Sequence, residues 1–268
     1  KGLGADRLVT GHWIPDSHYP AMDLYEKIPY GITMTSFGCP LSCSYYASRI
    51  LWPKYTRRTV PEVLREIDHQ VGLGAKDIAF YDDALLIDKK EYLYQLCRGS
   101  IKAYGERIRF HTPNGLHVRE IDDECAEMLK GSGFKTIRLS LESIDPKISD
   151  ASSGKVAREE YARAVRSLLN AGYSGTDCET YILLGLPGQS IDSVKETVRF
   201  VHSSGGKPKL AEFSPIPGTT SFNMAAEEMP GLKTEPLLHN NSVYSSWISG
   251  NISPEELQEL KDMARRRC

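Results

Sequence analysis

After residue 30, short apolar segments alternate regularly with amphipathic ones, and this order constrains the fold more than any other feature of the chain. Six segments have the length and apolar content of strands. They cover residues 31–37, 77–81, 107–111, 135–141, 177–184 and 208–214. Each of the first five is followed by residues with helical periodicity. Five strand–helix pairs and a sixth strand are typical of a parallel sheet covered by helices.

Capping signals support these helices. Thr59 precedes a helix start with Pro61 and Glu62, and Asp122 precedes another helix that is followed by glycines. Six strand units are fewer than the eight of a closed barrel. We therefore predict an α/β fold, a partial (β/α)6 TIM-like barrel over residues 31–222. An N-terminal arm or linker (1–30) precedes it and an irregular and helical tail (223–268) follows. A doubly wound sheet is the alternative, and both place the ligand site at the carboxyl ends of the strands.

Composition excludes several classes of protein. Lys plus Arg total 33 and Asp plus Glu total 35, so the net charge of −2 argues against bulk nucleic-acid binding. The 40% hydrophobic and 25% charged residues are ordinary for a globular chain. No run of about 18 apolar residues predicts a membrane span. Because no secretory signal accompanies the six cysteines, we expect a reducing, cytoplasmic location.

Two cysteines lie close together directly after the first expected strand. The segment reads Gly38-Cys39-Pro40-Leu41-Ser42-Cys43-Ser44-Tyr45-Tyr46. Thiolates at short spacing on a loop are the ligands that hold iron–sulfur clusters. The alternative is that these are two thiols without a metal.

This loop resembles the signature of the radical S-adenosylmethionine (SAM) family, in which the three cysteines are separated by three and then two residues and an aromatic precedes the last. Cys39, Cys43 and Tyr45 match it, whereas Tyr46 stands at the position of the third cysteine. Further segments, each after an expected strand, also resemble family segments. They cover residues 80–83, 112–115, 138–143, 182–188 and 213–219. The resemblance extends over roughly residues 30–222.

The resemblance implies a 4Fe–4S cluster, with SAM on its open iron, and reductive cleavage of SAM to a 5′-deoxyadenosyl radical. It also implies an electron donor and an unidentified small-molecule or peptide substrate, with methyl transfer as one outcome. The metal ligands it implies are Cys39 and Cys43, with Tyr46 at the third position. The residues it implies around SAM are Tyr45, Tyr81, Asp82, Asp83, Asn114, Arg138, Ser140, Glu142, Ile182, Leu184 and Pro215.

The segment at residues 19–25 resembles the lead-in of family members that carry a cobalamin-binding domain upstream. This likeness implies cobalamin as a further cofactor, held by a domain that is not in this chain.

Tyr46 leaves three interpretations open. It is a change introduced into an active enzyme, a mark of a natural degenerate member without a cluster, or a ligand of an unusual cluster. A free phenol has a pKa of about 10, against about 8.5 for a thiol. A phenol thus loses its proton to bind iron less readily than a thiol does. Two other functions stay open beside the radical enzyme. One is a non-catalytic barrel that has lost its cluster, and the other is an unrelated barrel enzyme for a phosphorylated substrate.

Overall fold

The computed structural model describes residues 19–149, 156–241, 243 and 253–266. Within them, six strands form one parallel sheet in the order β1-β4-β5-β7-β8-β9, and β6 pairs with β7 beside this path. The strands are β1 (Gly31–Thr33), β2 (Ser36–Phe37), β3 (Thr56–Arg57), β4 (Asp77–Phe80), β5 (Arg109–His111), β6 (Leu116–His117), β7 (Phe134–Glu142), β8 (Cys178–Leu184) and β9 (Lys207–Glu212). The predicted α/β fold with a parallel sheet is confirmed.

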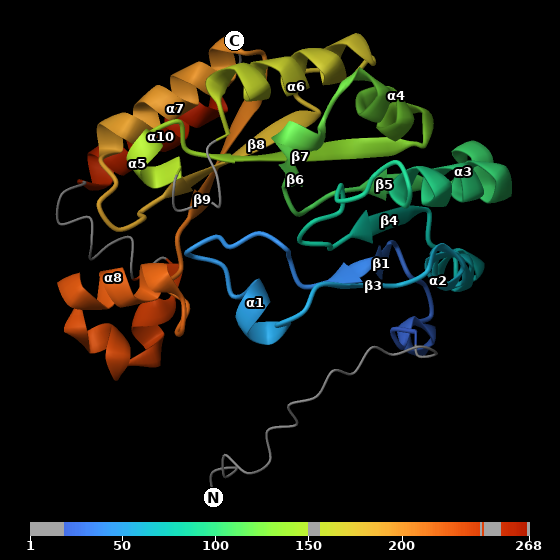
Figure 1. The fold of residues 1–268 in the computed structure, drawn as a ribbon, viewed down its shortest axis with the longest axis horizontal. Coiled ribbons are helices and arrows are strands. Elements are labelled where there is room, and N and C mark those ends of the chain that lie inside the picture. The colour runs from blue at the N-terminus through green and yellow to red at the C-terminus, as the bar shows by residue number, and fades with distance from the viewer. Residues whose placement is uncertain (1–18, 150–155, 242, 244–252, 267–268) are drawn as a thin grey trace, which may run out of the picture.

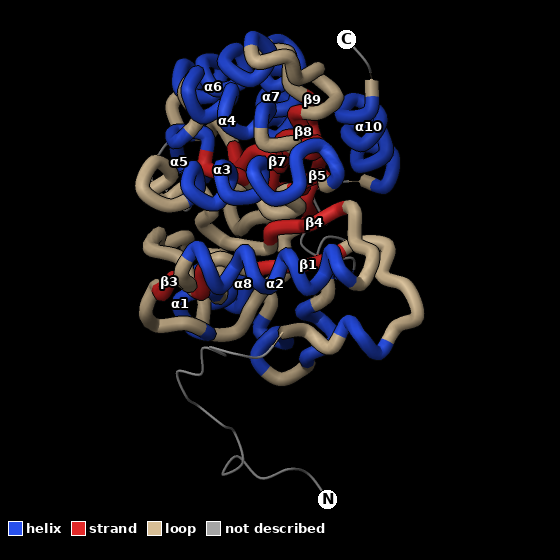
Figure 2. Tube along the Cα trace, turned by 90° about the vertical axis from the view of Figure 1, so that its right-hand side faces the viewer, coloured by secondary structure: helices blue, strands red, loops and turns tan. Residues whose placement is uncertain are grey.

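The sheet is curved, and helices lie along its outer side (Figures 1 and 2). The α-helices are α1 (Ser48–Leu51), α2 (Val60–Gly72), α3 (Leu93–Tyr104), α4 (Asp123–Gly131), α5 (Pro146–Ser149), α6 (Arg158–Asn170), α7 (Ile191–Ser203), α8 (Thr220–Glu228) and α10 (Pro254–Arg265). The expected caps are present. A capping box joins Thr59 and Glu62 before α2, and Asp122 accepts a hydrogen bond from the backbone of Cys125 at the start of α4.

Several element boundaries differ from those predicted. The expected strand 31–37 is two strands, because β1 pairs with β4 whereas β2 turns away to pair antiparallel with β3. The sequence also predicts a helix from Asp88 to about residue 103. This helix begins only at Leu93, since Asp88 has a positive φ of 49° that a helix does not accept. The two-residue strands β3 and β6 are too short for periodicity to reveal. Residues 1–18 of the expected arm and parts of the expected tail lie outside the described residues.

The pleat of the strands separates an apolar outer face from a polar inner face. On the outer face Phe80, Phe110 and Phe134 are buried, and the rings of Phe80 and Phe134 stack at 5.7 Å. On the inner face, the Arg138 guanidinium lies 2.6 Å from a carboxylate oxygen of Glu179. Buried charged groups require water or a partner. The inner face of this half-barrel therefore lines a cavity, and the hydrophobic core lies between the sheet and the helices.

A buried carboxylate fixes the start of the cysteine loop, which we define as residues 38–46. Asp82 lies two residues beyond the end of β4 and is 3% exposed. It accepts hydrogen bonds from the Thr35 backbone N–H at 3.0 Å, the Thr35 hydroxyl at 2.6 Å and the Ser36 hydroxyl at 2.7 Å. Burial raises the pKa of Asp82 despite these donors. The carboxylate thus joins the end of β4 to the strand that leads into Cys39.

None of the helices in the described part of the chain combines the length and apolarity that crossing a bilayer requires.

Replacing Asp82 with alanine should destabilise the protein by about 2–4 kcal/mol, because three buried donors lose their acceptor. Urea denaturation followed by circular dichroism measures this change. Asp23→Ala, which removes an exposed carboxylate, is the matched control and should change the free energy of unfolding by no more than about 0.5 kcal/mol. Equal effects of the two substitutions would contradict the anchoring role of Asp82.

Candidate active site

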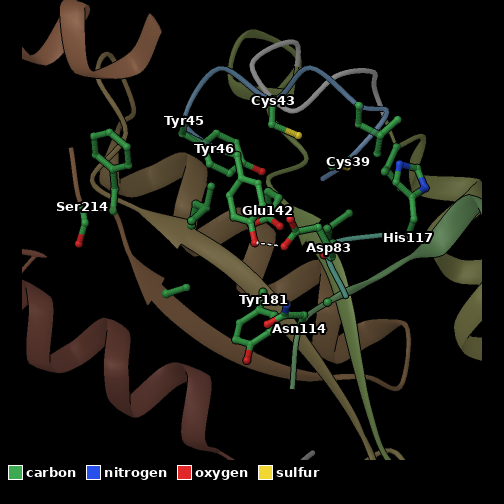
Figure 3. A pocket seen from close by; sticks show the side chains of 18 of the residues that line it. Cys39, Cys43, Tyr45, Tyr46, Asp83, Asn114, His117, Glu142, Tyr181 and Ser214 are labelled. Carbon is green, nitrogen blue, oxygen red and sulfur yellow. Dashed lines mark hydrogen bonds between the residues drawn. The ribbon is translucent and has the colours of Figure 1, made fainter. Parts of the chain in front are cut away.

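A cavity of about 360 Å³ opens at the carboxyl ends of the parallel strands. Its volume lies in the range of small-ligand pockets, roughly 300–1,000 Å³. The cysteine loop borders it on one side, and the ends of β7, β8 and β9 border it on the other (Figure 3). This is the edge at which the fold predicts a ligand site.

The cysteine loop starts with a turn that only glycine adopts readily. Gly38 has a φ of 81°, and a Cβ there would lie 3.1 Å from the Trp52 carbonyl oxygen. Cys39 and Cys43 follow. Both line the cavity, and neither forms a disulfide in the described part of the chain. Burial raises the pKa of Cys39. The far side of the loop is attached to α8, because the Ser44 and Ser221 hydroxyls lie 2.8 Å apart and the Ser221 N–H donates to the Ser44 carbonyl.

Tyr46 reaches from this loop across to the end of β4. Its hydroxyl donates to Oδ1 of Asp83 at 2.8 Å (Figure 3). The Ser48 hydroxyl donates to Oδ2 of Asp83 at 2.5 Å. Burial and the neighbouring Asp83 carboxylate raise the pKa of Tyr46. The phenol is therefore neutral at physiological pH and serves as a hydrogen-bond donor.

Glu142 at the end of β7 is the second acid in the cavity wall. It has a left-handed φ of 66°, an uncommon conformation for a non-glycine residue, of a kind that concentrates at functional sites. Loss of hydration raises the pKa of Glu142 to about 8, and a hydrogen bond from Ser140 opposes this shift. Near pH 7 this carboxyl is mostly protonated.

Hydrogen bonds between strand-end loops hold the rest of the rim. The Asn114 amide donates to the Tyr81 carbonyl at 2.9 Å, and the Tyr181 hydroxyl donates to the Pro113 carbonyl at 2.7 Å. In the loop after β8, the Gln189 side chain accepts from the Gly185 N–H and donates to the Leu183 carbonyl. Hydrogen bonds from side chains thus fix the backbone conformation of the loops that border the cavity.

The structure brings eight of the expected site residues together. Those that line the cavity are Cys39, Cys43, Tyr45, Tyr46, Asp83, Asn114, Ser140 and Glu142. It places the other six outside this lining. They are Tyr81, Asp82, Arg138, Ile182, Leu184 and Pro215.

The two-residue period of a strand explains most of these differences. On β8, Tyr181 and Leu183 face the cavity, so Ile182 and Leu184 pack into the core beneath the helices. On β7, Arg138 shares the face of Ser140 but lies deeper in the half-barrel, where it pairs with Glu179. Asp82 and Pro215 are replaced in the lining by their neighbours Asp83, Ser214 and Ile216.

Other lining residues are not in the set of SAM-binding and metal-binding residues that the sequence predicts. His117 on β6 is one, and its Nδ1 is buried without a hydrogen-bond partner among the described residues. Burial lowers the pKa of His117, so the ring is neutral. The remaining ones are Leu41, Pro113, Gly115, Leu141, Val156, Tyr181, Leu183, Ala211, Glu212, Phe213, Ser214 and Ile216. Strand alternation could have found Leu183 and Ala211, whereas β6 gave no periodic signal.

The donor set fits SAM but not a three-thiolate cluster site. The cavity offers carboxyl groups for a cation and apolar walls for a base. At the cysteine loop, however, it offers two thiols and a neutral phenol. Among the residues that the structure describes, no three His, Cys, Asp or Glu side chains lie together as metal ligands do.

Comparison with known proteins finds sequence relatives. The chain is 26% identical over 219 residues to an uncharacterised methyltransferase of Pyrococcus horikoshii, covering 79% of this chain and 46% of the relative. It is 23% identical over 201 residues to a tRNA-2-methylthio-N(6)-dimethylallyladenosine synthase of Sulfurihydrogenibium, covering 72% and 45%. The chain therefore spans about half the length of these curated relatives.

Solved structures share the fold. The radical SAM methyltransferase TsrM of Kitasatospora setae, solved with tryptophan and a SAM analogue, superposes with a TM-score of 0.66 at 18% identity, covering 78% of this chain and 41% of that one. Another structure of TsrM holds cobalamin and a [4Fe-4S] cluster. Coproporphyrinogen III oxidase of Escherichia coli, a radical SAM enzyme, matches with a TM-score of 0.57 at 12% identity, covering 75% and 48%. The predicted partial-barrel fold is confirmed by these likenesses.

The profile of the Radical SAM superfamily matches residues 33–201, which is more than half of the chain and includes the cysteine loop and strands β4 to β8. Together with the curved parallel sheet and the strand-end cavity, this match shows that the chain belongs to the radical SAM superfamily of enzymes.

Proposed function

We propose that the cavity binds S-adenosylmethionine, and that the chain is the SAM-binding core of a radical SAM enzyme. The observation that carries the proposal is the composition of the cavity. Asp83, Glu142 and Ser140 line the cavity from the ends of β4 and β7, and the apolar residues Leu183, Phe213 and Ile216 line it from the β8 and β9 side. A third acid of the lining, Glu212, is paired with Lys261. A ligand with a cationic amino-acid end and an aromatic base suits both kinds of wall.

Each group has a distinct role toward such a ligand. Asp83 and Glu142 supply negative charge for the ammonium and sulfonium groups. Ser140 offers a hydroxyl for the ribose, and the apolar wall excludes water from the adenine. The binding residues come from the ends of several strands, so the strands set their spacing.

Methyl or methylthio transfer is the reaction class that we propose for a full-length protein that contains this core. The relatives named as methyltransferases and the relative named as a tRNA-2-methylthio-N(6)-dimethylallyladenosine synthase support it. A cluster would supply the electron for reductive cleavage of SAM. Because this sequence offers two thiols beside Tyr46, we propose SAM binding, and not its cleavage, for the chain as it stands. A reducing compartment agrees with the five described cysteines, none of which forms a disulfide.

Filling the cavity should abolish ligand binding. Ala211 lines the cavity from β9, so Ala211→Trp should weaken SAM binding by about 30-fold or more, measured by isothermal titration calorimetry. Ile101→Trp places the same bulk at an exposed site on α3 and should bind SAM like the wild type. Absence of saturable SAM binding to the wild type, with both proteins folded, would falsify the proposed function.

SAM binding should also release a proton near pH 7. The pKa of Glu142 is about 8, so its carboxyl is mostly protonated without ligand. A sulfonium cation favours the carboxylate and lowers this pKa, so binding should release more than about half a proton at pH 7, and less as the pH rises above 8. Titration calorimetry in buffers of different ionisation enthalpy measures this number, and Glu142→Gln should release far less.

The other titratable groups of the cavity set the control for this experiment. They are Cys39, Cys43, Tyr45, Tyr46, Asp83, His117, Tyr181 and Glu212. If one of them released the proton, Glu142→Gln would still release it. Equal proton release by wild type and variant therefore contradicts the role of Glu142.

A further inference from the structure

Tyr46 stands where the family resemblance implies a third thiolate, and its side chain is already hydrogen-bonded to another residue. The Tyr46 hydroxyl donates to Asp83 at 2.8 Å, across the gap between the cysteine loop and the end of β4. Asp83 also accepts from Ser48 through its other oxygen. This one carboxylate therefore holds the chain on both sides of residue 47.

Other contacts also hold the cysteine loop in place. Ser44 is hydrogen-bonded to Ser221 of α8, and the Tyr46 N–H donates to the Cys43 carbonyl within the loop. Tyr45 packs against the apolar cluster that contains Phe213 and Phe222. Among these attachments, the Tyr46–Asp83 bond is the one that joins the loop to the strand next to the cavity.

We infer that the hydrogen bond from Tyr46 to Asp83 takes the place of the third iron–thiolate bond. It keeps the cysteine loop ordered, and the cavity open to its ligand, in the iron-free protein. The loop then depends on protein contacts where other chains with the three-cysteine signature depend on a cluster. Only the identity of the ligand rests on the proposed function.

Two consequences follow from the donor set. The two thiols of Cys39 and Cys43 do not complete a three-thiolate site, so the wild type should not retain a stable 4Fe–4S cluster. A thiol at position 46 would complete the set and at the same time remove the hydrogen bond to Asp83. Tyr46→Cys should therefore exchange one kind of attachment for the other.

Hydrogen–deuterium exchange of the iron-free protein tests the attachment. Peptides that cover residues 38–48 should be protected in the wild type and should exchange about tenfold faster in Tyr46→Phe, which keeps the ring and removes only the donor. Tyr25→Phe is the matched control. It removes a phenol hydroxyl at an exposed position outside the loop, so exchange of these peptides should stay near the wild-type rate. An unprotected wild-type loop, or equal exchange in wild type and Tyr46→Phe, overturns the inference.

Anaerobic reconstitution with iron and sulfide tests the second consequence. Tyr46→Cys should retain about four irons per chain after desalting, and the wild type less than about one. A wild type that retains four irons overturns the inference. SAM titration of the same iron-free wild type separates the two claims, because a protected loop without SAM binding rejects the proposed function and leaves the attachment standing.

Discussion

The turn at the end of β4 places two adjacent carboxylates on opposite sides of the chain, and the site depends on this arrangement. Asp82 points into the protein, where Thr35 and Ser36 satisfy it. Asp83 points toward the cavity, where it meets Tyr46 and Ser48. Because successive residues of an extended chain face opposite sides, one turn both fixes the strand before the cysteine loop and presents an acid to the loop itself.

The half-barrel explains why polar groups can gather at this edge. Its hydrophobic core lies between the sheet and the outer helices, so the inner face of the sheet is free to carry charge. Ionising an acid on this face costs free energy, and Glu142 shows this because its raised pKa reports poor hydration of the carboxylate. A cationic ligand would stabilise the carboxylate. The electrostatics of the cavity wall thus agree with the class of ligand that we propose.

Sequence patterns predicted the strands of the parallel sheet and most helices, because apolar periodicity and caps such as Thr59 and Asp122 are local signals. They also placed Cys39 and Cys43 after the first expected strand, Asp83 after the second and Glu142 at the end of the fourth. They did not reveal which neighbour of a pair faces the cavity. Ile182 and Leu184 were expected there, yet Tyr181 and Leu183 line it, because a shift of one residue reverses the face of a strand. The partner of Tyr46 was equally hidden, since that contact joins residues 37 positions apart.

A crystal structure of the iron-free protein grown with excess SAM tests the central claim most directly. Binding at the strand-end cavity predicts electron density for the ligand against Asp83, Glu142 and Leu183, with the Tyr46 side of the cysteine loop in place. An ordered protein whose cavity holds no SAM, or that binds SAM elsewhere on its surface, would contradict the claim.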